Sequence, residues 1–148
     1  MRVAAAVVLV LAACGGRPAT TPTPVFTVQV LEADSIAHAL VQRAFDADVQ
    51  LANPDTLYIP DAEIIVNGAP RAEAPRFAGV AAGGSVQLGS SRFAVTGNYV
   101  WGTMQYRWVP GTAGNRMVGA WATFVIARVK DGGWRILHVH SSTSPENQ

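Results

Sequence analysis

The chain has 148 residues, 49% of them hydrophobic and 14% charged, and its eleven basic residues nearly balance ten acidic ones. A chain of this length can bury a core of its own as one domain. Balanced charge, with no basic stretch interleaved with aromatic residues, excludes the electrostatic pattern of a nucleic-acid-binding protein, so we expect no nucleic acid as a partner. The single cysteine excludes an internal disulfide.

The first fourteen residues have the plan of an export signal. Arg2 precedes an apolar run over residues 3–11, and residues 11–14 read Leu-Ala-Ala-Cys. This end of the run resembles the lipobox of bacterial lipoproteins, and the run is too short to span a bilayer, which takes about 20 apolar residues. The resemblance implies cleavage before Cys14 and lipidation of its thiol. The alternative is an ordinary secretory signal with an incidental cysteine.

Residues 15–24 (GGRPATTPTP) contain three prolines, three threonines and two glycines without apolar periodicity. Such a composition predicts an extended, solvated tether. The expected organisation is therefore a signal peptide over 1–13, a lipid-anchored tether over 14–24 and one domain over 25–148. Because Gly15 rather than aspartate follows the cysteine, the resemblance implies a cell-envelope protein that is sorted to the outer membrane in a bacterium with two membranes.

The first part of the domain has a helical period. Apolar residues at three-and-four spacing predict one long amphipathic helix over residues 34–51, with Asp34 or Ser35 as its N-cap. Asn53 and Pro54 predict the start of a second, short helix that ends at Tyr58. The period then shortens to two, which predicts a strand over residues 62–66 before the Asn-Gly turn signal. The alanine- and proline-rich stretch 70–80 predicts a turn or a short helix.

The rest of the domain predicts a meander of four strands, over residues 85–96, 99–109, 117–130 and 134–143, with glycine, asparagine or proline turn signals at each boundary. Helices followed by antiparallel strands indicate the α+β class. Strands of ten or more residues exceed the usual length, so we expect a strongly bent sheet with bulges near Gly89, Gly102 or Gly119.

Residues 131–142 (DGGWRILHVHSS) resemble the closing strand of the nuclear transport factor 2-like superfamily, also called SnoaL-like. Their Trp-x-x-x-His-x-His-x-Ser pattern is similar to that of the association domain of calcium/calmodulin-dependent kinase II and its bacterial relatives. The helix, the Pro-Asp-Ala strand start at 60–62 and the meander fit the same plan. The resemblance implies a cone, in which a bent sheet wraps the long helix and leaves a pocket. That superfamily hosts isomerases, dehydratases, cyclases and non-catalytic binding modules.

The predicted strand 117–130 is apolar on both faces. One face carries Met117, Gly119, Trp121, Thr123, Val125 and Ala127, and the other carries Val118, Ala120, Ala122, Phe124 and Ile126. A strand with one solvated face would alternate between polar and apolar residues, so both faces need a cover and one helix supplies only one. We therefore expect a homodimer through the outer face of the sheet, which the family resemblance also implies.

A binding pocket needs aromatic walls and a few polar groups. The candidates on the two central strands are Trp101, Gln105, Arg107, Trp121 and Thr123, and the alternative role for these residues is core or dimer contact. In the kinase association domain the strand before the closing one contributes arginines to the pocket, whereas residues 121–127 contain none. The resemblance therefore favours a small neutral ligand. If Trp101 and Trp121 filled the cone completely, a purely structural envelope protein would be favoured instead.

An enzyme of the isomerase or dehydratase type would need a carboxylate or histidine in an apolar pocket for general acid–base chemistry on a small apolar substrate. The candidates are Asp48, Asp61, Glu63, His138 and His140. Each carboxylate has a simpler explanation, with Asp61 as a turn residue, Glu63 in solvent and Asp48 on the polar side of the helix.

His138 and His140 share one face of the last strand with Trp134, Ile136 and Ser142, and His38 lies on the long helix. No metal-ligand spacing, catalytic-triad order or cofactor fingerprint accompanies them, so hydrogen bonding in an interface is favoured and neither metal nor cofactor is expected. The sequence thus favours a membrane-tethered small-molecule-binding or association module over an enzyme.

Overall fold

A computed structural model describes residues 26–144, with side chains described from residue 34 onward. In chain order it contains a long helix α1 (Phe26–Val49), a short 3-10 helix η1 (Asp55–Leu57) and the strands β1 (Tyr58–Val66), β2 (Ala69–Pro70), β3 (Ser85–Thr96), β4 (Tyr99–Val109), β5 (Val118–Arg128) and β6 (Trp134–Thr143). The expected signal peptide, Cys14 and the tether lie outside the described residues. Over the described range, no helix is both long and apolar enough to cross a membrane.

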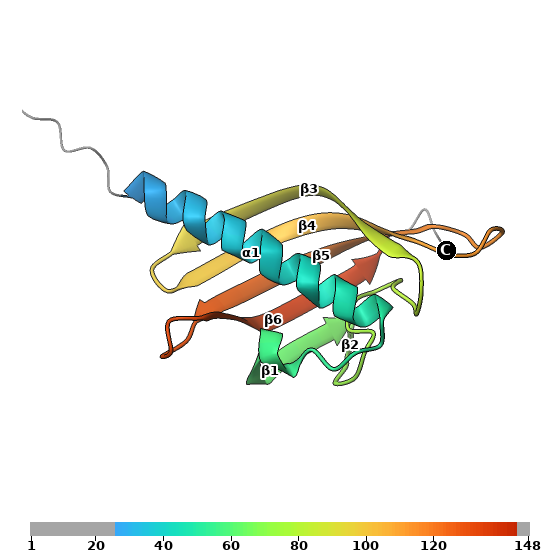
Figure 1. Cartoon of the computed structure of the whole chain (residues 1–148), viewed down its shortest axis with the longest axis horizontal. Helices are drawn as coiled ribbons and strands as arrows, with labels where there is room; N and C mark the ends of the chain where they lie inside the picture. The colour runs from blue at the N-terminus through green and yellow to red at the C-terminus, as the bar shows by residue number, and fades with distance from the viewer. Residues whose placement is uncertain (1–25, 145–148) are drawn as a thin grey trace, which may run out of the picture.

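The strands form one mixed sheet in the order β2-β1-β6-β5-β4-β3. The four long strands β3 to β6 pair antiparallel as consecutive neighbours, and β1 joins the other side of β6 in parallel. Figure 1 shows α1 lying across one face of the curved sheet. One helical layer against one mostly antiparallel sheet is the α+β architecture that the sequence predicts.

The turn signals located the strands of the meander well. β3, β4 and β6 have the predicted bounds, and β5 is shorter than the predicted 117–130 at both ends. The predictions before Ser85 were less accurate. β1 begins at Tyr58, four residues before the predicted strand, and the predicted short helix is the three-residue η1.

Helix α1 begins eight residues before its predicted start at Asp34. Between Pro24 and Pro54 the chain contains neither proline nor glycine, so no residue in this stretch breaks a helix. The helix ends in paired hydrogen bonds, from the Leu51 amide to the Asp48 carbonyl (3.1 Å) and from the Ala52 amide to the Ala47 carbonyl (2.9 Å). Leu51 has a φ of 51°, and this left-handed residue turns the chain away from the helix axis.

The buried face of α1 repeats at three-and-four spacing and consists of Ala37, Leu40, Val41, Ala44, Phe45 and Asp48. The prediction that Asp48 lies on the polar side of the helix is wrong. Position 48 follows Phe45 by three residues and Ala44 by four, and a period of 3.6 residues turns it toward the sheet. The carboxylate therefore enters the core with the apolar residues.

The two faces of the sheet differ sharply in exposure. Along β4, residues alternate between buried and exposed, and the exposed set is Tyr99, Trp101, Thr103, Gln105 and Arg107. On β5, Trp121 and Thr123 are exposed while their neighbours on the inner face are buried. Trp101 is 52% exposed and Trp121 is 49% exposed, so the alternative in which they fill the cone is wrong. They stand on the outer face, opposite α1.

Two irregularities interrupt the pairing of the long strands. The register of β3 against β4 shifts between Leu88 and Ser91, which confirms the bulge predicted near Gly89. The register of β5 against β6 shifts beside Val125, where Leu137 is the extra residue on β6. No bulge was predicted there.

The other two glycines predicted to mark bulges lie in regular pairing. Gly102 of β4 pairs with Phe93 of β3 on one side and with Phe124 of β5 on the other, without a register shift. Gly119 of β5 likewise pairs regularly with Arg107 of β4. A side chain at Gly102 would collide with the Arg92 carbonyl oxygen and with Phe93. That glycine therefore allows a close approach between β3 and β4 rather than a bulge.

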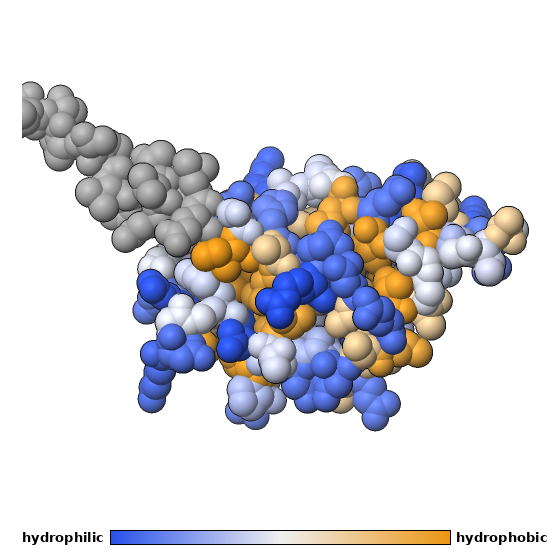
Figure 2. Space-filling model, viewed as in Figure 1, coloured by the Kyte–Doolittle hydropathy of each residue, from blue (hydrophilic) through white to orange (hydrophobic). Residues whose placement is uncertain are grey.

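Aromatic rings fill the middle of the space between α1 and the sheet. The Phe45 ring centroid lies 4.0 Å from that of Phe77 and 4.6 Å from that of Tyr106, and the Phe124 centroid lies 5.8 Å from that of Phe77. None of these four residues is more than 1% exposed. On the α1 side of the molecule, Figure 2 shows hydrophilic residues over the middle of the view and hydrophobic residues around them.

Candidate functional site

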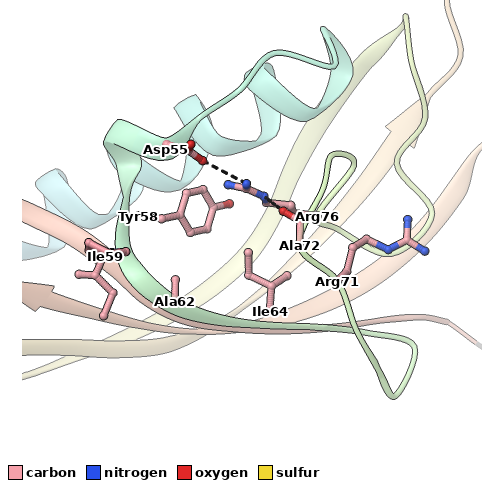
Figure 3. A pocket seen from close by; sticks show the side chains of 9 residues that line it. Asp55, Tyr58, Ile59, Ala62, Ile64, Arg71, Ala72 and Arg76 are labelled. Atoms are coloured by element: carbon pink, nitrogen blue, oxygen red, sulfur yellow. Dashed lines mark hydrogen bonds and ion pairs between the residues drawn. The ribbon is translucent and has the colours of Figure 1, made fainter.

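A cleft opens at the β1 edge of the sheet, between that strand, η1 and the chain that follows β2. Its volume is about 400 Å³. We call it the β1 cleft, and Figure 3 shows the side chains that line it. The lining residues are Asp55, Tyr58, Ile59, Pro60, Ala62, Ile64, Arg71, Ala72 and Arg76.

One wall of the cleft belongs to residues 71–84, which form no helix or strand and which we call the crossing segment. Buried side chains hold its backbone. One oxygen of the Asp48 carboxylate, Oδ2, accepts hydrogen bonds from the amides of Arg76 and Phe77, the latter at 2.9 Å. These bonds orient two successive residues in opposite directions, with Phe77 buried in the aromatic cluster and the Arg76 side chain lining the cleft.

Three further side chains fix the rest of the crossing segment. The Ser141 hydroxyl accepts from the Ala78 amide (2.9 Å), and the Tyr106 hydroxyl donates to the Ala78 carbonyl (2.7 Å). The Trp108 indole donates to the Gly83 carbonyl (3.1 Å). Because a buried backbone group without a partner is costly, these bonds allow an irregular segment to pass over the core.

Asp48 is an unusual residue for the core of a small domain. It is 0% exposed, and its second oxygen, Oδ1, has no hydrogen-bond partner among the described residues. Burial raises the pKa of this carboxyl from 3.8 to about 6, and the amides of Arg76 and Phe77 offset part of that rise. The carboxyl therefore changes its protonation state only one unit below neutral pH.

Tyr58 contributes the most buried polar group of the cleft wall. The residue is 6% exposed, and its hydroxyl makes no hydrogen bond of good geometry with the described residues. Burial raises its pKa, as does the nearby Asp48, so the phenol stays protonated and able to donate. The Arg76 guanidinium lies over the ring, 4.7 Å from its centre, and Figure 3 shows the hydroxyl directed toward that arginine.

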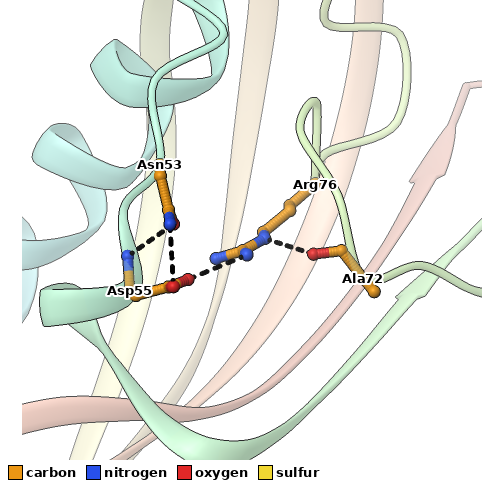
Figure 4. Close-up of polar contacts among 4 residues, drawn as sticks. All are labelled: Asn53, Asp55, Ala72 and Arg76. Carbon is orange, nitrogen blue, oxygen red and sulfur yellow. Dashed lines mark hydrogen bonds and ion pairs between the residues drawn. The ribbon is translucent and has the colours of Figure 1, made fainter.

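Arg76 is held at the mouth of the cleft by two oxygen acceptors, as Figure 4 shows. Its Nη2 lies 3.2 Å from Asp55 Oδ1, and its Nε donates to the Ala72 carbonyl at 3.0 Å. Asn53 donates to the other oxygen of Asp55 at 2.8 Å. The Asn53 and Arg76 hydrogen bonds lower the pKa of Asp55, which keeps it charged. With Arg71 on the rim, the lining holds two cations and one anion.

The five residues proposed from sequence as pocket walls share one surface, but it is not the β1 cleft. Trp101, Gln105, Arg107, Trp121 and Thr123 all lie exposed on the outer face of β4 and β5. Gln105 and Arg107 also border a depression of about 220 Å³ beside the β3 bulge. The structure thus brings these residues together on the face for which we predicted a dimer.

The candidate catalytic residues other than Asp48 lie in solvent or on that same outer face. Asp61 is exposed. His138 Nδ1 lies 3.1 Å from Glu63 Oε2, because β1 and β6 pair these two positions. His140 pairs with Thr123 across β5 and is exposed. No cleft residue is among these four.

The expectation that Ile136 shares a face with His138 and His140 is wrong. Because of the extra residue at Leu137, Ile136 is fully buried while the histidines point outward. His38 lies on α1 and contacts β3, with its Nε2 3.2 Å from the Ser91 hydroxyl. Among the described residues, no three histidine, cysteine or acidic side chains gather in a way that could hold a metal ion.

Sequence reasoning missed the residues that build the cleft. Tyr58 was assigned to the end of a short helix, and Arg71 and Arg76 were passed over within an alanine- and proline-rich stretch. The available signal was Asp48, since an acidic residue at the spacing of an apolar helix face predicts a buried carboxylate with donors supplied by another segment.

No protein-family model matches the chain. No curated protein sequence matches it either. Solved structures do match. One is a nuclear transport factor 2-like protein with a cystatin-like fold from Novosphingobium aromaticivorans, 16% identical over 81% of this chain and 87% of that one, with a TM-score of 0.58.

Two more solved structures match over most of their length. The nuclear transport factor 2-like superfamily protein from Salmonella enterica is 19% identical, with 82% of this chain and 96% of that one covered and a TM-score of 0.58. The "putative ketosteroid isomerase" of Parabacteroides distasonis is 13% identical, with 76% and 88% covered and a TM-score of 0.57. The chain therefore has the cone-shaped nuclear transport factor 2-like fold that the C-terminal motif predicts.

The buried carboxyl predicts a pH dependence of stability. Because the pKa of Asp48 rises from 3.8 to about 6 on folding, the folded state holds this proton more tightly than the unfolded chain does. Asp48 therefore contributes fully to the free energy of unfolding below about pH 4. This contribution falls by roughly 3 kcal/mol at most as the pH rises through 6. Urea unfolding of the wild type and Asp48→Asn across this range measures it.

The variant serves as the control, because an asparagine does not titrate and all other groups cancel in the difference between the two proteins. The unfolding free energy of the wild type minus that of the variant should fall by up to roughly 3 kcal/mol from pH 4 to pH 7. A difference that stays constant across that range would show that Asp48 does not titrate as described.

Proposed function

We propose that the chain is a module that binds a small molecule in the β1 cleft and carries out no chemistry on it. The observation that carries this proposal is the cleft itself, which borders the buried Tyr58 hydroxyl, a donor with no acceptor among the described residues. The centre of the cone is closed by the cluster around Phe45 and Phe77, so a ligand has its room at the rim. Apolar walls with a few polar groups are the usual character of a small-molecule site.

If a small molecule binds in the β1 cleft, a bulky side chain on the floor of the cleft should abolish its binding. Ala62 is a half-buried lining residue, and Ala62→Trp fills the space without touching Asp48's hydrogen bonds. In a thermal-shift screen of small metabolites against the full chain, compounds that stabilise the wild type should not stabilise Ala62→Trp. They should still stabilise the control Thr96→Trp, which places the same side chain on an exposed residue at the end of β3. Compounds that stabilise all three proteins equally would place binding elsewhere.

A second candidate function is general acid–base catalysis of the isomerase or dehydratase type. The buried Asp48 carboxyl, whose pKa is about 6, favours it. The name of the Parabacteroides neighbour is compatible with it. Against it, Asp48 is not among the cleft-lining residues, and its Oδ2 already serves two backbone amides. We therefore prefer binding without catalysis.

We further propose that two copies associate through the outer face of the sheet. That face exposes Tyr99, Trp101 and Trp121, each about half exposed, and an uncovered group of large aromatic side chains is typical of an interface. A two-fold axis through this face would cover each copy's aromatic residues with those of the other.

If two copies associate through the outer face of the sheet, charged side chains introduced on that face should separate them. The double variant Trp101→Lys/Trp121→Lys should sediment as a monomer under conditions in which the wild type is a dimer. Gln50→Lys changes an exposed residue directly after the end of α1, away from the outer face of the sheet, and this variant should remain dimeric. A wild-type chain that is monomeric at micromolar concentration would exclude the proposal.

We also propose that the protein is exported and anchored through Cys14, as the lipobox resemblance implies, with the tether holding the domain near a membrane of the cell envelope. Several acyl chains give an effectively permanent anchor, whereas one is marginal. In a bacterial host, the wild type should incorporate labelled palmitate and fractionate with membranes, and Cys14→Ser should lose both properties. Palmitate incorporation that persists in Cys14→Ser would exclude this anchor.

A further inference from the structure

The charges around the β1 cleft indicate what kind of molecule it takes. The lining includes two guanidinium groups, from Arg71 and Arg76, and a single carboxylate, from Asp55, so it has an excess of one positive charge. Arg76 is paired with Asp55, whereas Arg71 donates to the Pro75 carbonyl at 3.2 Å. A ligand with one negative charge would balance it. Arginine is the side chain best suited to a carboxylate, because its planar fork matches the two oxygens.

A second polar group, the Tyr58 hydroxyl, lies beside Arg76, and no described residue accepts a hydrogen bond from it. The Tyr58 hydroxyl is buried, and the guanidinium of Arg76 stacks on the same ring at 4.7 Å. A phenol with a raised pKa remains a donor at neutral pH. The hydroxyl oxygen is covered in this structure, and a small shift of the neighbouring Arg76 would bring a carboxylate oxygen at this end of the cleft within reach of it. That oxygen would then accept from a buried donor that has no acceptor among the described residues.

The remainder of the lining is mostly apolar. On the β1 side the walls are formed by Ile59, Pro60, Ala62 and Ile64. An inorganic anion would leave these side chains in contact with water, whereas the hydrocarbon part of an organic acid would cover them. A volume of about 400 Å³ suits a small molecule rather than a peptide or a polymer.

We propose, on the basis of the binding function proposed above, that the ligand of the β1 cleft is a small organic acid with one carboxylate and an apolar body. Its carboxylate binds Arg76 and the Tyr58 hydroxyl, and its hydrocarbon part lies along β1. This replaces the neutral ligand expected from sequence, which rested on the absence of arginines from residues 121–127 and did not take the crossing segment into account.

Asp55 makes the proposal sharply testable, because its carboxylate already occupies part of the Arg76 guanidinium. Its side chain is 69% exposed, and the ion pair spans 3.2 Å at the surface. The Arg76 side chain is only 11% exposed, but an asparagine at position 55 keeps an oxygen that can accept from it, so neutralising Asp55 should leave the fold intact. It should also remove a competitor and a repulsive charge, and therefore strengthen the binding of an acid while leaving a neutral ligand unaffected.

The experiment is calorimetric titration of the full chain at pH 7 with acetate, hexanoate and benzoate, each matched to its amide (acetamide, hexanamide, benzamide), and with inorganic phosphate. At least one acid should bind ten-fold or more tightly than its amide and than phosphate. Arg76→Gln and Tyr58→Phe should each weaken that acid ten-fold or more, and Arg71→Gln should weaken it a few-fold. Asp55→Asn should tighten it a few-fold.

The outcomes separate the ligand class from the binding function. An amide that binds as tightly as its acid, with the loss of affinity in Ala62→Trp, would overturn the acid while the binding function stands. Phosphate that binds as tightly as the best acid would show an inorganic-anion site and overturn the organic acid. If none of the seven compounds binds and the metabolite screen also fails, the binding function falls as well. Should Arg76→Gln fail to fold, Asp55→Asn and Tyr58→Phe decide the question.

Discussion

The structure depends on one buried carboxylate. Asp48 lies on the apolar face of α1, and one oxygen of its carboxylate accepts hydrogen bonds from the amides of Arg76 and Phe77 in the crossing segment. Hydrogen bonds to a charged acceptor in a low-dielectric interior are stronger than those between neutral groups, so two of them fix the position of a segment without secondary structure. Burial also destabilises the charged form of this carboxyl, which raises its pKa.

The consequences of this contact reach both the core and the cleft. Phe77 on one side of the crossing segment completes the aromatic cluster with Phe45, which closes the cone between α1 and the sheet. Arg76 on the other side is directed over Tyr58 and toward Asp55, which forms the mouth of the β1 cleft. With these two hydrogen bonds in place, the centre of the cone is filled by aromatic side chains and the open cleft lies at its rim. The outer face of the sheet, with its exposed tryptophans, is a separate surface, through which we propose that two copies associate.

The parts of the fold that local signals determine were predictable. Glycine, asparagine and proline between the long strands fixed the bounds of β3, β4 and β6, and the C-terminal motif predicted the family of folds. The bulge at Leu137 and the burial of Ile136 were not predictable, because an extra residue in a strand is set by its partner rather than by its own pattern. The cleft was missed for the same reason: Arg76 acquires its position from Asp48, 28 residues away in the chain.

Backbone hydrogen exchange in the full chain tests the central contact most directly. If the Asp48 carboxylate holds the crossing segment, the amides of Arg76 and Phe77 should exchange as slowly as those of the central strands, although no helix or strand contains them. The amides of the exposed residues Ala72 and Glu73, only a few positions earlier, should exchange much faster. Exchange at Arg76 and Phe77 as fast as at Ala72 would contradict the account, since the segment would then open independently of the carboxylate.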